Sequence, residues 1–229
     1  MSHSHIQLGV TRGLRRLPPH HGSQRDETFQ EELKKLLQRG VAGVRCYHCG
    51  VGIIEPAVGE VTNLNGDHTD MTPSNLELVC ELCHGAQHLD MLEEKLASAD
   101  VGKMIYLPDM EQGELNALFW AISYSFTQSG GALSPEKIDG VEYQYSGLSV
   151  YMKLDKRSSL VPSEIQSVGK FSQFLKKMSD DQFLNRHKVI SNLRWLPPLE
   201  HYKDLVVKGY GLSFSKIDFN SWPSLIGEV

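Results

Sequence analysis

The chain has 229 residues, of which 40% are hydrophobic and 22% are charged, and its formal net charge at pH 7 is −5. The length allows one large domain or two small ones, and the composition is that of an ordinary globular protein. The negative balance argues against a global basic surface for a nucleic-acid backbone. No apolar run approaches the roughly 20 residues that a membrane-spanning helix needs, and the first residues lack the apolar core of a signal peptide. We therefore expect a cytoplasmic protein that reaches a membrane only through a partner.

The first 26 residues are poorly patterned and contain Pro18-Pro19. They predict an extended arm with at most a short strand. The pattern then changes, because Thr28 and Glu31 form a capping-box pair and the leucines after them recur at helical spacing as far as Gly40. An amphipathic helix is therefore predicted directly before the first cysteine.

All four cysteines lie in two Cys-x-x-Cys pairs, Cys46 with Cys49 and Cys80 with Cys83. Two such pairs on tight turns can complete a tetrahedral shell at about 2.3 Å from Zn²⁺. A reducing compartment, which the missing secretory signal favours, would also favour a metal over disulfides. Four unligated thiols, or two redox-active dithiols, are the alternatives. The sequence predicts a structural zinc site with these four ligands.

Short elements are predicted between and after the cysteine pairs. Residues 53–61 are apolar but interrupted by Pro56 and Gly59, which favours a short, irregular hairpin. A turn at 63–66 and a polar loop precede a short strand that ends at Cys80. A helix should follow the second pair, and its buried face comprises Leu82, Ala86, Leu89, Leu92 and Leu96.

The second half of the chain reads as mostly helical. A short strand at 104–107 precedes a helix with Asp109 and Gln112 as its capping box, which ends at Ser129-Gly-Gly131. Residues 141–154 fit both a helix and a strand. A helical stripe follows Pro162, formed by Val168, Phe171, Leu175 and Met178.

Ser179 and Gln182 are predicted to cap the next helix, which Trp195-Leu-Pro-Pro198 interrupts. The buried face of that helix should comprise Phe183, Leu184, Ile190 and Leu193. A last helix is expected over 199–208, and the aromatic tail, if ordered, docks on the body or on a partner. The predicted fold class is α+β, with a small four-cysteine zinc module and a mostly α-helical C-terminal half. The expected domains are an arm of residues 1–26, a zinc-binding domain of residues 27–103 and a mainly helical domain of residues 104–229.

The order of helix, Cys-x-x-Cys-Gly, hairpin and Asn-Leu-x-x-x-Cys-x-x-Cys-His resembles the HNH (ββα-metal) nuclease family. The matching stretches are residues 46–50, 65–76 and 80–84, together with His88. In that family a structural zinc is separate from a catalytic divalent ion. A histidine on the first strand activates water, an asparagine holds the loop, and helix histidines hold the catalytic metal. The resemblance implies an HNH-like zinc module with Asn75, His84 and His88 in the last two roles.

The position of the catalytic base distinguishes two alignments. In the favoured one, the family's His-His pair falls on Thr62 and Asn63, and asparagine has no group that titrates near neutrality and could take a proton from water. In the other, Asp67-His68 supplies the base, but the loop before Asn75 is shorter than usual. We expect a lost or degenerate nuclease centre, although His68 and His84 leave nuclease activity open. The two helix histidines could hold a weak second metal, or face solvent or cap the local fold.

A closer resemblance is to the IcmJ/DotN family of type IVB secretion and conjugation systems. The matching stretches are residues 63–67, 74–76, 80–83, 105–116 (Ile-Tyr-Leu-Pro-Asp-Met-Glu-Gln-Gly-Glu-Leu-Asn) and 192–197 (Asn-Leu-Arg-Trp-Leu-Pro). They occur in the family's order, and 105–116 lies outside the zinc fold, so general HNH similarity cannot explain it. This chain departs from the family in its longer ends and at His68 and His84, where some relatives should lack histidine.

This second resemblance implies a non-enzymatic adaptor with no catalytic residues. It would bind the cytoplasmic C-terminal region of the type IV coupling-protein ATPase and its effector adaptors, in the complex that recruits secreted effectors. The expected location is the cytoplasm, peripherally at the inner membrane through that complex, and nucleic acid is not an expected partner. The alternative is a metal-dependent HNH DNA endonuclease that uses His68 or His84.

Overall fold

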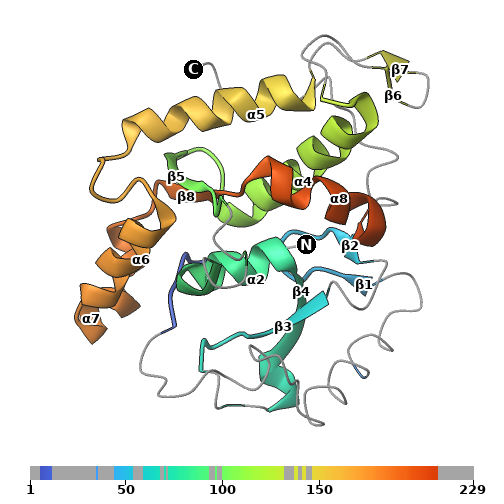
Figure 1. Ribbon diagram of the computed structural model, residues 1–229. Coiled ribbons are helices and arrows are strands. Elements are labelled where there is room, and N and C mark those ends of the chain that lie inside the picture. The colour runs from blue at the N-terminus through green and yellow to red at the C-terminus, as the bar shows by residue number, and fades with distance from the viewer. Residues whose placement is uncertain are drawn as a thin grey trace.

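The computed structural model combines helices with short antiparallel sheets, which confirms the predicted α+β class (Figure 1). The described residues are 6–11, 35, 44–53, 59–67, 70, 72–92, 96, 100–131, 137–138, 141–142 and 146–210. Within these ranges, every sheet has two strands. None of the helices in this part of the chain is both long enough and apolar enough to cross a bilayer.

Two small hairpins and a helix carry the cysteines. These elements are β1 (Val44–Arg45), β2 (Gly52–Ile53), β3 (Gly59–Asn63), β4 (Leu76–Cys80) and α2 (Glu81–Gln87), with a 3-10 turn, η3 (Pro73–Asn75), before β4. β1 pairs with β2, and β3 pairs with β4 from Gly59 opposite Cys80 to Asn63 opposite Leu76. α2 follows β4 without a connecting loop, so the second hairpin and the helix form one ββα unit. The strand predicted to end at Cys80 is confirmed.

The helix after the second cysteine pair is shorter than its sequence pattern indicated. It stops at Gln87, and a 3-10 turn, η4 (Leu89–Met91), continues the chain. The break lies at His88, whose backbone is not helical (φ −133°, ψ 53°). The apolar positions predicted to share one face are nevertheless all buried, namely Leu82, Ala86, Leu89, Leu92 and Leu96. The change of direction therefore keeps the later leucines in the core.

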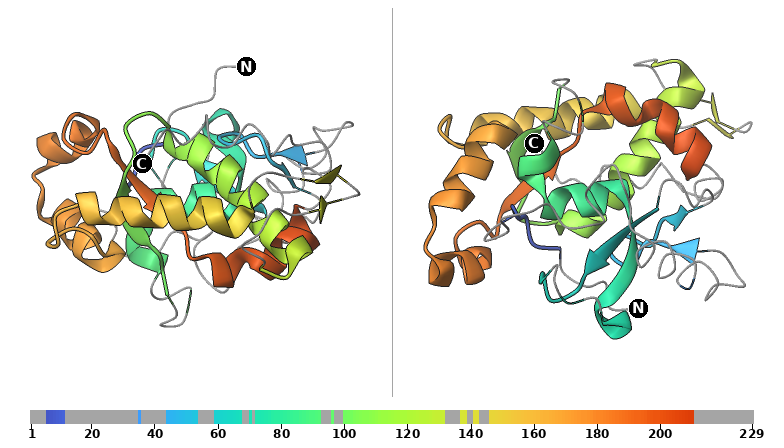
Figure 2. Two further views of the ribbon diagram at one scale, coloured as in Figure 1. Left: turned by 90° about the horizontal axis from the view of Figure 1, so that it is seen from above. Right: turned by 60° about the horizontal axis from the view of Figure 1, so that its bottom comes forward.

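The second half of the described chain is arranged around one long helix, α4 (Gln112–Ser129). The other elements are β5 (Lys103–Tyr106), β6 (Lys137–Ile138), β7 (Val141–Glu142), α5 (Gly147–Lys156), η5 (Arg157–Leu160), α6 (Val168–Lys177), α7 (Asp180–Leu184), η6 (Arg186–Lys188), β8 (Leu193–Leu196) and α8 (Leu199–Gly209). Helices α5 and α8 pack on α4, and α2 contacts it from the cysteine side (Figures 1 and 2). β5 pairs with β8, and β6 pairs with β7.

Most predicted elements of this half are confirmed. Strand β5 and helices α6 and α8 coincide with predicted segments, and the α6 stripe is buried. Ser179 and Gln182 form the predicted capping box of α7. Gly130 ends α4 in the left-handed conformation. The ambiguous stretch 141–154 contains both structures, since β7 is a strand and α5 begins after the N-cap Ser146.

The predicted start of α4 is wrong by two residues. Glu111 and Glu114 form its capping box, rather than Asp109 and Gln112. The side chain of Gln112 is engaged elsewhere, because it accepts from the backbone N–H of Trp195 and donates to the carbonyl of the same residue.

The continuous helix predicted across residues 183–193 is also wrong, although Ile190 is buried and Phe183 and Leu193 pack against the core. Helix α7 ends at Leu184, whose side chain is 69% exposed. Leu193 is the first residue of β8 and pairs with Tyr106 of β5. Pairing with β5, together with the bonds between Gln112 and the backbone of Trp195, satisfies backbone groups of β8, and this tertiary gain outweighs the helical spacing.

Residues 6–11, called the N-terminal segment below, are part of the core. Ile6, Leu8 and Val10 are each at most 6% exposed, at alternate positions of an extended chain. The backbone of Gly9 exchanges hydrogen bonds with Ala86 and Leu89, at 3.1 and 3.0 Å. Apolar side chains that alternate along an extended segment are a strand-like pattern, which the surrounding polar residues obscure in the sequence.

Buried apolar side chains form one continuous cluster on both sides of residue 103. The cluster joins leucines of α2, aromatic residues of α4 and Trp195 of β8. The division into domains at that residue stays a prediction. The helix predicted at 28–40, apart from Lys35, most of the N-terminal arm and the aromatic tail lie outside the described residues.

Gly102 has both a positive φ (83°) and a neighbour that leaves no space for a side chain. A Cβ atom there would lie 2.2 Å from the carbonyl oxygen of Leu196. Gly130 has a similar φ (64°) and nothing within 4 Å of its Cβ position. Both Gly→Ala changes cost about 1–2 kcal/mol for the left-handed conformation. We expect Gly102→Ala to lower the free energy of unfolding by several kcal/mol more.

Urea unfolding followed by circular dichroism measures the difference between the two variants. Equal losses for Gly102→Ala and Gly130→Ala would contradict the close approach of residue 102 to β8.

Candidate metal centre

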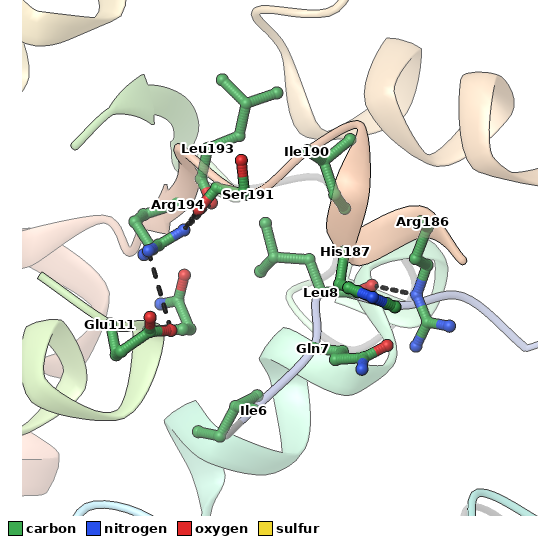
Figure 3. Close-up of a pocket in the computed structure, with 11 residues that line it drawn as sticks. Ile6, Gln7, Leu8, Glu111, Arg186, His187, Ile190, Ser191, Leu193 and Arg194 are labelled. Carbon is green, nitrogen blue, oxygen red and sulfur yellow. Dashed lines mark hydrogen bonds and ion pairs between the residues drawn. The ribbon is translucent and has the colours of Figure 1, made fainter. Parts of the chain in front are cut away.

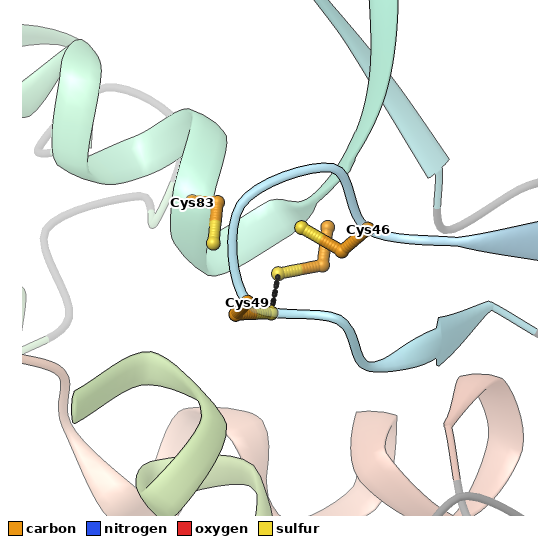
Figure 4. Close-up of side chains that lie close together, drawn as sticks. Cys46, Cys49 and Cys83 are labelled. Atoms are coloured by element: carbon orange, nitrogen blue, oxygen red, sulfur yellow. Dashed lines mark hydrogen bonds between the residues drawn. The ribbon is translucent and has the colours of Figure 1, made fainter. Parts of the chain in front are cut away.

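The structure brings the four cysteines to one point. Their sulfur atoms all lie within 4.8 Å of one another, and all four residues are buried. The Sγ atoms of Cys49 and Cys80 are 3.6 Å apart (Figure 4). Cys46 and Cys49 lie on the turn between β1 and β2, Cys80 ends β4, and Cys83 lies in the first turn of α2. The clustering that the spacing predicted is therefore present.

The turn between β1 and β2 is held by the backbone. The N–H of Cys46 donates to the carbonyl of Val51 at 2.8 Å, and the N–H of Gly50 donates back to Cys46 at 2.9 Å. Gly50 has a φ of 73°, which glycine adopts without steric cost. The N–H of Tyr47 donates to Leu78 and so attaches the turn to β4. The two cysteine pairs are thus fixed relative to each other by main-chain hydrogen bonds.

The donor set fits one thiolate-bound metal ion. A tetrahedral shell with metal–sulfur distances of about 2.3 Å places its sulfurs about 3.8 Å apart, which agrees with the observed cluster. Burial and the neighbouring sulfurs raise the pKa of the Cys83 thiol, and hydrogen bonds to the neighbouring cysteines raise the pKa of the Cys49 thiol. The cluster therefore resists full ionisation unless a cation compensates its charge. Four sulfur ligands also leave no open position for a substrate, which is the arrangement of a structural site.

Helix α4 donates two hydrogen bonds to the cysteine sulfurs. Asn116 Nδ2 lies 3.3 Å from the Sγ of Cys83, and Trp120 Nε1 lies 3.4 Å from the Sγ of Cys80. Both donor residues are fully buried. N–H groups directed at thiolates stabilise the ionised form and orient it for a metal. Sequence reasoning missed these residues; the available signal was the polar Asn116 one helical turn before Trp120 in a helix predicted to be part of the core.

A polar chain continues from Asn116 to the β5–β8 sheet. Gln112 Nε2 donates to Asn116 Oδ1 at 2.8 Å and to the carbonyl of Trp195 at 3.0 Å, and the N–H of Trp195 donates to Gln112 Oε1 at 2.8 Å. The three sequence stretches 80–83, 105–116 and 192–197 therefore meet in one hydrogen-bonded network. Cys83 lies at one end of it and the backbone of β8 at the other.

An aromatic cluster joins the same centre to α8. The ring of Trp120 lies 4.2 Å from that of Tyr210 and 5.7 Å, nearly perpendicular, from that of Tyr202. The N–H of Glu81, at the start of α2, lies 3.5 Å from the hydroxyl of Tyr210. Through these contacts, the packing of the last described helix depends on the geometry around Cys80.

Asn63, at the end of β3, and Asn75, at the end of η3, bind backbone groups of the loop between them. Asn63 Nδ2 and Asn75 Nδ2 both donate to the carbonyl of Asp70, at 2.8 and 2.9 Å, and Asn75 Oδ1 accepts from the N–H of Asn65. Thr62, beside Asn63, donates to the side chain of Gln87. Asn75 therefore holds the loop, as the sequence resemblance implied, and Asn63 holds it through a hydrogen bond to the same carbonyl.

The two helix histidines are buried rather than solvent-facing. His84 and His88 are each 6% exposed, and their ring centroids are 4.7 Å apart. His88 lies just after α2 and not within it. Among the described residues, no group of three metal-binding side chains other than the cysteine cluster is present. His68, the base of the second alignment, lies outside the described residues.

Asn75→Asp should destabilise the chain, because a carboxylate oxygen would replace the buried amide of Asn75 that donates to the carbonyl of Asp70. We expect a loss of about 1–3 kcal/mol in the free energy of unfolding. Asn185→Asp is the matched control, since Asn185 Nδ2 makes the same kind of bond, to Asp181, at an exposed position. A comparable loss in both variants, measured by urea unfolding, would argue against a loop held by Asn75.

No family model matches the chain. It is 26% identical over 187 residues to the type 4 apparatus protein DotN of Legionella pneumophila, a match that covers 80% of this chain and 79% of DotN. The matched length is far greater than the cysteine region, so it includes most of the described fold. It also agrees with the resemblance found in the stretches that form the hydrogen-bonded network. The extent of this similarity, together with these stretches, supports a place for the chain in the IcmJ/DotN family.

Proposed function

We propose that this chain is a non-enzymatic, zinc-stabilised adaptor subunit of a type IVB secretion system. In this role it binds the cytoplasmic C-terminal region of the coupling-protein ATPase and takes part in the coupling complex that recruits effectors, peripherally at the inner membrane. The observation that carries the proposal is the similarity to a type 4 apparatus protein over 80% of the chain. A similarity of that extent involves the helical half as well as the metal centre.

The metal in this proposal is Zn²⁺. Zinc accepts four thiolates in tetrahedral geometry and has no redox chemistry of its own, so it acts as a crosslink between the β1–β2 turn, β4 and α2. Buried sulfurs that receive N–H bonds from Asn116 and Trp120 support such a role. One Zn²⁺ per chain is expected, and Cys80→Ser should prevent folding, because metal binding and folding of such a site are coupled.

Trp120→Phe should weaken zinc binding about 10- to 100-fold, because it removes the N–H that reaches Cys80 Sγ and keeps an aromatic ring. The measurement is competition with a chromophoric chelator on purified full-length chain. Tyr202→Phe is the control, since it alters the same aromatic cluster and loses a buried hydroxyl that makes no hydrogen bond to sulfur.

Absence of zinc in elemental analysis, or four freely reactive thiols in the native protein, would refute the zinc site. Equal zinc affinity in Trp120→Phe and Tyr202→Phe would refute the role of the indole N–H.

The absence of catalysis is supported by the surroundings of the positions that a nuclease would use. Asn63 stands where the favoured alignment expects a base, it is 3% exposed, and its amide is bound to the loop backbone. His84 and His88 are also buried, at 6% exposure each. To cleave DNA, a nuclease must bring the phosphodiester into contact with a metal ion and a base. Side chains as buried as these give a phosphodiester little access.

The experiment for the adaptor role is affinity capture of the tagged full-length chain from its native host. We expect the coupling-protein ATPase to be recovered with the wild type and lost with Cys80→Ser. A wild-type capture without that ATPase would refute the proposed partner.

The zinc-loaded chain should also leave plasmid DNA intact in Mg²⁺ or Mn²⁺. If the chain cleaves plasmid DNA and His84→Ala abolishes the cleavage, the proposed adaptor function is refuted in favour of the alternative, a metal-dependent endonuclease.

A further inference from the structure

A cavity of about 350 Å³ lies between the N-terminal segment, the start of α4 and residues 186–194. Its apolar surface comes from Ile6, Leu8, Ile190 and Leu193. Figure 3 shows Arg194 and Glu111 on one side of Leu8, and Arg186 and His187 on the other. The cavity thus combines an apolar interior with cationic groups on two sides.

Arg194 is a buried cation whose charge is weakly compensated. It is 5% exposed, and its guanidinium donates to the carbonyls of Met110, Ser191 and Leu193. The closest carboxylate is that of Glu111, 3.7 Å away on a half-exposed side chain. Burial accordingly lowers the pKa of Arg194. A charge in such surroundings gains from a further anionic neighbour.

Three consecutive basic residues, Arg186 to Lys188, form η6 and the basic rim opposite Arg194; Arg186 and His187 line the cavity, and Lys188 follows them. The Arg186 guanidinium donates to the carbonyls of Leu8 and Phe183 and lies 4.1 Å above the ring of Phe183. These contacts fix its position beside the cavity. His187 and Lys188 are exposed. In a chain with a net charge of −5, this rim is a local basic surface.

Two apolar side chains next to the rim are turned to solvent. Leu184 is 69% exposed and Val189 is 68% exposed, which makes them the most exposed large hydrophobic residues in the described part of the chain. They flank η6, close to α7 at one end of the molecule (Figures 1 and 2). Exposed apolar groups beside charged ones are typical of protein-binding surfaces.

We propose that the η6 surface, which consists of Leu184, residues 186–189 and the adjoining cavity, binds an acidic peptide segment of a protein partner. An apolar side chain of that segment enters the cavity, and neighbouring carboxylates approach Arg194 and the basic rim. The apolar lining argues against a nucleic-acid backbone, which would place phosphates against Ile190 and Leu193. The inference deepens the proposed function and rests on it, since the expected owner of the segment is the coupling-protein ATPase.

The test is capture of that ATPase from native host lysate by tagged full-length chain. The test variant is Lys188→Glu/Val189→Asp. The control is Lys156→Glu/Leu160→Asp on the end of α5 and on η5, where both residues are also exposed. Both variants change the net charge by the same amount and place an acidic group at an exposed apolar position. Thermal unfolding verifies that both are folded.

We expect the test variant to recover at least about tenfold less ATPase than the control, and wild-type capture to weaken as salt rises. Equal recovery with both variants would overturn the η6 surface and leave the adaptor role intact. No ATPase with the wild type would overturn both proposals. Capture that disappears after nuclease treatment of the lysate would show a nucleic-acid ligand and also overturn the inference.

Discussion

The contact between α4 and the cysteine sulfurs is the constraint on which the arrangement of the fold depends. Four buried thiolates would repel one another unless a cation compensated their negative charge. Two of the sulfurs also accept hydrogen bonds from N–H groups of α4, a helix that begins at Gln112, 29 residues after Cys83. The surroundings of the four cysteines are completed by Asn116 and Trp120 of α4. Any rearrangement of α4 would therefore alter the environment of their sulfur atoms.

The same constraint links three of the stretches that resemble the IcmJ/DotN family. The stretches around Cys83, Gln112 and Trp195 are distant along the chain and adjacent in space. Each supplies a group whose loss would leave a buried polar partner unsatisfied, and such losses cost more than the net value of a hydrogen bond. Substitution at such positions is therefore costly. The need to keep these buried hydrogen bonds links segments that lie in different predicted domains.

The sequence predicted well whatever depends on local pattern or ligand chemistry. The cysteine cluster, the strand ending at Cys80, the α6 stripe and the capping box at Ser179 are of this kind. Features set by distant partners were missed. The strand β8 is not predicted, because its partner β5 is remote in sequence: Leu193 fits the preceding helix and Trp195 begins its interruption. The two sulfur-bonding donors of α4 look like ordinary residues of an apolar helix. Burial of the N-terminal segment also depends on surfaces that no local window contains.

That N-terminal segment has a consequence for synthesis of the chain. Leu8 receives a hydrogen bond from Arg186, 178 residues later, and Gly9 is bonded to the end of α2. On the ribosome the segment emerges well before residues 186–193, which complete its binding surface. Three apolar side chains therefore stay unprotected while the intervening residues are synthesised, and contacts of such sequence separation form slowly. During that interval this segment is a site at which chaperones and proteases can act on the newly made chain.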